Sequence, residues 1–155
     1  SKISALPQMK VAWLACTGPD ELVPAAVERL EVIADTYLSL NAPTQWAIPA
    51  LFEQRRPVRR QLLERIRTNR AELARQLLAQ NACELLESEG GWYAVLRMAA
   101  DQADEERAIQ LMREQRVIVH PGHFFDFPKD GFLVVSLITP GEPFAEGIKR
   151  LVAGV

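Results

Sequence analysis

The sequence predicts an α+β fold, an α/β sandwich in which a small four-stranded antiparallel or mixed sheet is covered by helices and preceded by further helices. From residue 83 onward the patterns follow the order strand, strand, helix, strand, strand, helix, and the residues before them are helical in pattern. The apolar fraction of 48% and the charged fraction of 25% are typical of a globular domain with a true core. This order of elements packs most economically as a sheet with helices on one face.

The first half of the chain is expected to be mostly helical. A first helix is predicted over about 24–38, where apolar residues repeat at helical spacing. Thr44 is the expected cap of a second helix over 45–55, and Pro49 inside it should cause a kink because proline removes one backbone hydrogen bond. The longest helix is predicted from Pro57 to Gln80.

The second half begins with a predicted hairpin. Residues 83–87 and 92–98 are the two strands, joined through a turn that contains Gly90 and Gly91. A helix over about 104–115 follows, with acidic residues in its first turn as the helix dipole favours.

Residues 117–139 hold both histidines and four of the six phenylalanines of the chain. Two β-branched, apolar runs flank a Pro-Gly turn and a Lys-Asp-Gly turn, which predicts two strands with an aromatic loop between them. A loop this aromatic is unfavourable in water, so we expect it to pack on the protein or to line a pocket. Residues 139–142 form a predicted capping box for a last helix.

The bulk composition excludes several classes of function. A net charge of −2 gives no reason to expect nucleic acid or an anionic membrane as a partner. Cys16 and Cys83 make no disulfide framework and fit a reducing compartment, so we expect a cytoplasmic protein. No apolar run approaches the length of a transmembrane helix.

His120 and His123 are the candidate metal ligands, three residues apart across the Pro-Gly turn. A metal site usually needs three or four ligands, and only Asp126 or a distant cysteine could complete this one. The favoured interpretation is a pair of loop imidazoles that bond backbone or solvent, and pocket lining is its main competitor. A free-standing metal-binding domain is the last-ranked hypothesis.

Residues 11–16 form a short, nearly continuous apolar run, consistent with a strand that is buried on both faces. This strand does not fit the unit that begins at residue 83, and it is expected to be the edge of a different domain. We expect its unpaired edges to pair with another copy of the chain or to fold back on the sheet.

The segment Ser1-Lys2-Ile-Ser-Ala-Leu-Pro-Gln-Met-Lys10-Val-Ala resembles the cofactor-lysine signature of class I/II aminotransferases, the fold type I pyridoxal-phosphate enzymes. Residues 40–45, the Gly-Gly-Trp-Tyr run at 90–93 and residues 117–136 resemble further segments of that family in the same order. The resemblance covers essentially the whole chain. It corresponds to the C-terminal part of the family's proteins, namely the end of the large domain and the small domain.

The resemblance implies two cofactor-binding residues. Lys2 would attach pyridoxal phosphate covalently through its amine and later move a proton between carbon atoms, a role that needs an amine able to be neutral near pH 7. Lys10 stands where the family has an arginine that binds the cofactor phosphate. A lysine can bind phosphate as a point charge, although it lacks the bidentate geometry of arginine.

Val134 is the most informative departure from the family pattern. The family places an arginine there, two residues before Ser136, and that arginine binds the α-carboxylate of the substrate. Because valine cannot pair with a carboxylate, either the substrate lacks one or another cation replaces the arginine. Arg97 and a histidine of the loop are the candidates.

We therefore expect residues 1–19 to be a remnant of a large cofactor-binding domain and residues 20–155 to be a small domain with its connecting helix. The resemblance implies a homodimeric enzyme that transfers an amino group between an amino acid and a 2-oxo acid, while this chain alone is expected to be inactive. The alternative is a non-catalytic ligand-sensing or interaction domain with the same fold.

Overall fold

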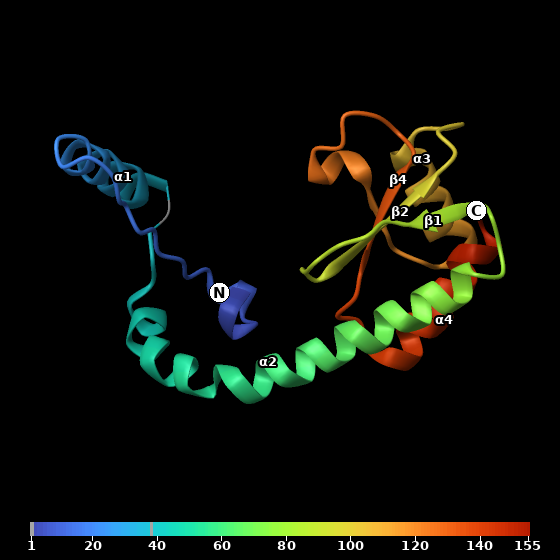
Figure 1. Ribbon diagram of the computed structural model, residues 1–155, viewed down its shortest axis with the longest axis horizontal. Helices are drawn as coiled ribbons and strands as arrows, with labels where there is room; N and C mark the ends of the chain where they lie inside the picture. The colour runs from blue at the N-terminus through green and yellow to red at the C-terminus, as the bar shows by residue number, and fades with distance from the viewer. Residues whose placement is uncertain (1, 38) are drawn as a thin grey trace. The chain divides into compact units, whose positions relative to one another are not determined.

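The chain divides into two units, Ser1–Gln61 and Leu62–Val155. The computed structural model describes residues 2–37 and 39–155, and the side chain of Lys2 lies outside that description. The helix α2, Ala42–Leu77, contributes residues to both units. The sheet and every other helix from residue 83 onward belong to the second unit (Figure 1).

The first unit contains no strand among its described residues, so the strand predicted over 11–16 is wrong. Val11 is buried, and it lines a small cavity together with Ile48 and Leu51 of α2. The Trp13 ring lies 5.5 Å from that of Phe52, centroid to centroid. This apolar run therefore packs on a helix. A strand requires a neighbouring strand to satisfy its backbone groups, and the described part of this unit offers none.

The first unit also holds the short 3₁₀ helices η1, Lys2–Ser4, and η2, Pro7–Met9, and the helix α1, Val23–Tyr37, which confirms the first predicted helix. The boundary predicted at Pro57 is wrong, because α2 continues through both Pro49 and Pro57. Each proline removes one N–H donor, but Gln45 and Glu53, whose carbonyls lose that donor, are exposed to water.

The start of α2 is capped by Asn41 and not by Thr44 as predicted. The Asn41 side-chain oxygen accepts a hydrogen bond from the Thr44 backbone N–H at 2.8 Å, which is the usual geometry of an N-cap. Thr44 lies inside the first turn, and its own hydroxyl donates to the same Asn41 oxygen at 2.5 Å.

The second unit confirms the predicted four-stranded sheet. Its strands are β1, Cys83–Leu85; β2, Tyr93–Met98; β3, His120–Pro121; and β4, Phe132–Ser136. Their order is β1-β2-β4-β3, and every neighbouring pair is antiparallel. The third strand is shorter than predicted. Residues 117–119 precede it without strand pairing, and the Ile118 side chain is 81% exposed.

The remaining helices agree with prediction in position and differ at their ends. They are α3, Asp104–Gln110, continued by the π-helical turn η3, Leu111–Gln115, and α4, Gly141–Ala153. Arg116 ends η3 with φ 59° and ψ 34°, the left-handed conformation that glycine adopts most readily at the end of a helix. The predicted capping box is wrong: Pro140 is the N-cap of α4, and the Thr139 hydroxyl donates to the Ser136 carbonyl at 3.5 Å.

One face of the sheet forms the core of the second unit. Alternation along β2 buries Ala94 and Leu96 completely on this face. The covering side chains come from the end of α2, from η3 and from α4, which lie along this side of the sheet in Figure 1. The core residues on these helices are Leu73, Leu77, Leu111, Phe144, Ile148 and Leu151.

Asn69 joins α2 to the end of β4. Its side-chain amide is 2% exposed and donates to the carbonyls of Leu137 and Thr139, at 2.9 and 2.8 Å. These carbonyls lie between β4 and α4, where no strand pairing is available to them. The amide therefore fixes the helix against the sheet through two directed bonds.

Asn69→Ala should lower the free energy of unfolding by about 2 kcal/mol, because one buried and one partly buried carbonyl lose their donor. Urea denaturation followed by circular dichroism measures this loss. Thr68→Ala is the matched control, since Thr68 is the exposed neighbour on the same helix, and its effect should stay within about 0.5 kcal/mol. Equal effects of the two substitutions would contradict the role given to Asn69.

Candidate functional site

The two lysines singled out by sequence lie in the first unit. The backbone of Lys2 begins η1, while its side chain lies outside the described residues. Lys10 ends η2 in the left-handed conformation, with φ 53°, and its backbone N–H donates to the Pro7 carbonyl at 3.2 Å. Its side chain is exposed, and within the described residues no carboxylate contacts it. Lys10 thus presents an unpaired positive charge, which is compatible with a phosphate ligand.

Val134 lies in the second unit, on the sheet face opposite the core. Its neighbours across the sheet are Val95 on β2 and His120 on β3. Paired residues share a face, so we define the outer face by the side chains that alternate with the core residues. These are Tyr93, Val95, Arg97, His120, Phe132, Val134 and Ser136.

Val134 is only 1% exposed, so it is covered by its neighbours and cannot itself be a contact for a ligand in this structure. The short helix η4, Gly122–Phe125, supplies aromatic rings to the outer face. Phe125 meets Tyr93 edge-on at 5.2 Å between ring centroids, and it lies 6.0 Å from the His120 ring.

The ring contacts continue from His120 to Phe124 at 6.1 Å, and from Phe124 to His123 at 4.9 Å. We call the five rings the aromatic cluster: Tyr93, His120, His123, Phe124 and Phe125. Phe124 is 65% exposed, and Phe125 and Tyr93 are more than one third exposed. The loop therefore packs on the sheet through Phe125, while the Phe124 ring stays largely in solvent. Phe127 takes another place, stacked on Phe132 with centroids 4.5 Å apart.

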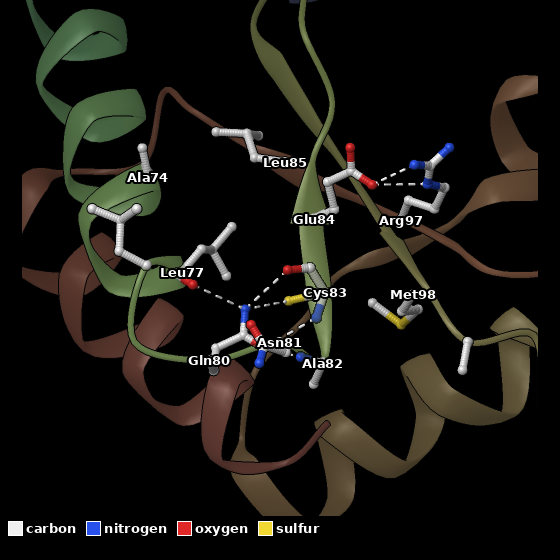
Figure 2. Close-up of a pocket in the computed structure, with 12 residues that line it drawn as sticks. Ala74, Leu77, Gln80, Asn81, Ala82, Cys83, Glu84, Leu85, Arg97 and Met98 are labelled. Atoms are coloured by element: carbon white, nitrogen blue, oxygen red, sulfur yellow. Dashed lines mark hydrogen bonds and ion pairs between the residues drawn. The ribbon is translucent and has the colours of Figure 1, made fainter.

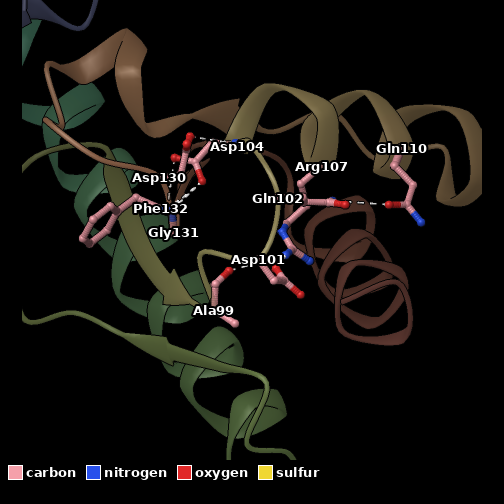
Figure 3. Close-up of polar contacts among 9 residues, drawn as sticks. All are labelled: Ala99, Asp101, Gln102, Asp104, Arg107, Gln110, Asp130, Gly131 and Phe132. Carbon is pink, nitrogen blue, oxygen red and sulfur yellow. Dashed lines mark hydrogen bonds and ion pairs between the residues drawn. The ribbon is translucent and has the colours of Figure 1, made fainter.

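Asp104 bonds the two turns that lie on either side of η4 in the chain, and Figure 3 shows its bonds to Gly131 and Phe132. Its side chain is buried, and its carboxylate accepts hydrogen bonds from the backbone N–H groups of Gly131 at 2.7 Å, Phe132 at 3.1 Å and Gly122 at 3.3 Å. The Asp104 backbone N–H in turn donates to the Asp130 carboxylate at 3.0 Å. One carboxylate therefore ties the start of α3 to the Pro-Gly turn and to the Lys-Asp-Gly turn.

Gly122 allows this approach because it has no side chain. A Cβ atom there would lie 2.8 Å from the Phe132 Cβ and 3.0 Å from an Asp104 carboxylate oxygen. Sequence reasoning treated Asp104 only as an acid that suits a helix N-terminus. It did not connect this acid with the two glycine-containing turns, whose buried backbone N–H groups both need an acceptor.

The outer face also carries Arg97, whose guanidinium Nε donates to the Glu84 carboxylate at 3.0 Å. Both side chains are more than half exposed. This ion pair lies at the β1 edge of the sheet, beside a groove of about 690 Å³ that Figure 2 shows. Arg97 therefore already has an anionic partner.

Gln80 closes the edge of β1 in the same groove. Its side-chain oxygen accepts from the Cys83 N–H at 3.0 Å, and its side-chain nitrogen donates to the Cys83 carbonyl at 3.0 Å (Figure 2). The Cys83 thiol is 8% exposed, and burial raises its pKa. A thiol with a raised pKa forms little thiolate, so Cys83 is a poor nucleophile.

Other candidate sites gain no support. Within residues 2–37 and 39–155, no group of three or more His, Cys, Asp or Glu side chains could hold a metal ion. No helix in the described part of the chain is long and apolar enough to cross a membrane.

The arginine-rich face of α2 is a solvated surface with paired charges. Arg75 donates two hydrogen bonds to Glu72 and lowers the pKa of that carboxyl to about 2.

The fold is a helix-covered antiparallel sheet whose outer face carries an aromatic cluster, preceded by a helical unit with two lysines near its start. The family model for aminotransferases of class I and II matches residues 1–143, so the chain belongs to the class I and II aminotransferase family. Enzymes of this family use pyridoxal phosphate. Among curated protein sequences, none matches the chain.

Solved structures of aminotransferases resemble the chain in fold. A pyridoxal-phosphate-dependent aminotransferase from Streptococcus suis is 18% identical, with a TM-score of 0.72 over 97% of this chain and 38% of that one. A tyrosine aminotransferase from Leishmania infantum is 19% identical, with a TM-score of 0.72 over 87% of this chain and 34% of that one.

A probable N-succinyldiaminopimelate aminotransferase from Thermus thermophilus is 24% identical, with a TM-score of 0.68 over 87% of this chain and 35% of that one. Identities this low establish the fold alone. The chain spans between 34% and 38% of the length of these three proteins.

Asp104→Ala should lower the free energy of unfolding by about 3 kcal/mol, because buried N–H groups lose a charged acceptor. Glu105→Ala is the control, since Glu105 is an exposed acidic residue of the same helical turn. We expect this second substitution to cost less than about 1 kcal/mol in urea denaturation. A small effect at Asp104 would show that the two turns are held by other contacts.

A thiol reagent such as 5,5′-dithiobis(2-nitrobenzoate) should modify one cysteine of the native chain rapidly at neutral pH. Cys16 is partly exposed, whereas burial hinders Cys83 and raises its pKa. Cys16→Ser should abolish the rapid phase, and urea should release the second thiol. Fast modification in the Cys16→Ser protein would contradict the burial of Cys83.

Proposed function

We propose that the chain is the small-domain part of a pyridoxal-phosphate-dependent aminotransferase that transfers an amino group between an amino acid and a 2-oxo acid. The observation that carries the proposal is the family match from residue 1 to residue 143, which begins at the lysine segment and runs through the aromatic loop and β4. In this proposal, residues 1–19 derive from the cofactor-binding domain and residues 20–155 form the small domain.

The proposal gives Lys2 and Lys10 the roles implied by the resemblance. Pyridoxal phosphate, when bound, supplies an electron sink for the negative charge that develops at the reacting carbon atom. Lys2 would hold the cofactor through its side-chain amine and move the proton. Lys10 is exposed and unpaired within the described residues, so its charge is available to the cofactor phosphate.

The chain alone supplies too few groups to retain the cofactor. Among the described residues, Lys10 is the one candidate phosphate ligand that the family resemblance points to, and a single exposed cation binds an anion weakly. We therefore propose that the isolated chain is inactive and that the remaining cofactor contacts come from residues outside this sequence.

We further propose that the complete enzyme is a cytoplasmic homodimer. Two free cysteines support a reducing compartment. The first unit also leaves large apolar side chains in contact with solvent, including Trp13 at 62% exposure, Leu14 at 76% and Tyr37 at 79%. Exposed apolar surface of this extent supports burial against further protein.

A second candidate function is a non-catalytic ligand-sensing or interaction domain. Val134 favours it, because the position that would bind a substrate carboxylate is apolar and buried. The two candidates differ in whether the protein that contains this chain exchanges amino groups.

In the longer protein that contains this chain, adding an amino acid should change the absorbance of bound pyridoxal phosphate, and adding a 2-oxo acid should reverse the change. Lys2→Ala should abolish both changes, because the amine that holds the cofactor and moves the proton is gone. The isolated 155-residue chain should give no stable cofactor absorbance. A cofactor that binds the longer protein without any exchange would favour the sensing domain. A stoichiometric Lys2 adduct in the isolated chain would contradict its predicted inactivity.

A further inference from the structure

The outer face of the sheet contains two side chains that can carry a positive charge close to Val134, namely Arg97 and His120. Both stand on strands that flank the position where the family has an arginine. The sequence leaves open which of them could bind a substrate carboxylate in its place. The contacts of the two side chains differ, and they separate the candidates.

Arg97 is already paired. Its guanidinium donates two hydrogen bonds to the Glu84 carboxylate, one of them at 3.0 Å. Arg97 pairs across the sheet with Phe132 on β4 and with Glu84 on β1. On its own strand it is the next outer-face residue after Val95, which is the neighbour of Val134. To bind a substrate there, it would have to leave its anionic partner and turn away from the β1 edge.

His120 is the direct neighbour of Val134 across the β3–β4 ladder. Its imidazole is half-buried between Phe124 and Phe125, with ring centroids 6.1 and 6.0 Å away. Within the described residues it has no hydrogen-bond or ion-pair partner, and no ring nitrogen is buried without one. Its nitrogens therefore reach solvent, and the packing of the ring limits the directions in which they point.

We propose that a ring N–H of His120 donates a hydrogen bond to the carboxylate of the amino donor, and that Tyr93, Phe124 and Phe125 contact an aromatic or large apolar side chain of that donor. This inference rests on the proposed aminotransferase function. The aromatic cluster consists mainly of apolar ring surface. Besides His120, its one other imidazole is that of His123, so the cluster suits a monocarboxylic donor better than a dicarboxylic one.

The geometry also sets the expected strength of the interaction. A histidine ring can donate one hydrogen bond to a given carboxylate, because its two nitrogens point in different directions, whereas a guanidinium can offer two parallel donors to both oxygens. Binding through His120 should therefore be weaker than binding through arginine. Removing the carboxylate from the donor should therefore weaken its binding less than it would in an enzyme that binds the carboxylate through arginine.

The test compares phenylalanine with 2-phenylethylamine, which is the same compound without the carboxylate, as donors for the longer protein with pyridoxal phosphate bound. His120→Gln should raise the KM for phenylalanine about tenfold, the equivalent of about 1.4 kcal/mol, and leave kcat largely unchanged. Its KM for 2-phenylethylamine should stay unchanged. His120→Lys supplies a cationic N–H donor and should recover most of the loss.

His123→Gln is the matched control, because His123 belongs to the same turn but is exposed and lies farther along the cluster. It should leave both KM values unchanged. Equal rises for the two donors in His120→Gln, an absence of any rise, or no recovery in His120→Lys would each overturn the inference while leaving the aminotransferase function intact. Failure of the unmodified holoenzyme to accept either donor or any other amino acid would overturn the proposed function and this inference with it.

Discussion

The second unit depends on a single buried carboxylate. Asp104 stands at the first turn of α3 and accepts hydrogen bonds from backbone groups of two separate turns. The N-terminus of a helix stabilises negative charge, so the helix dipole and the three N–H donors act together on the same group. Because the turns flank η4 and β4, the carboxylate determines where the aromatic rings lie relative to the sheet.

Periodicity predicted the helices and strands of the second unit well, because each has one apolar face and short connections. In β2 this apolar face carries Ala94 and Leu96, which are fully buried in the core. Periodicity could not predict the hydrogen bonds of the Asp104 carboxylate, because they join residues 18 to 28 positions apart and produce no repeating pattern in the sequence. Periodicity could not give the strand registers either: the register of β2 against β4 makes Val95, and not Arg97, a neighbour of Val134, and the register of β3 makes His120 the other neighbour.

The first unit was predicted less well, and for two physical reasons. The apolar run at 11–16 has the composition of a buried strand, but strand formation depends on a partner strand that the described residues of this unit do not contain. Pro57 was predicted to be a helix boundary, although an exposed helix tolerates the loss of a donor where water replaces it. The roles of Lys2 and Lys10 came from family resemblance alone. They stay predictions, because the described geometry includes no cofactor contact for either.

The bond pair between Gln80 and Cys83 has a consequence for the behaviour of the sheet in a crowded solution. An outermost strand with free backbone groups is a template on which other chains can add strands and begin to aggregate. At Cys83 both backbone groups already bond one glutamine side chain from the same chain, so this position offers no free donor or acceptor to an approaching strand. The short length of β1 leaves little further template beside it. Through one glutamine, the protein protects this border of its sheet without a covering helix.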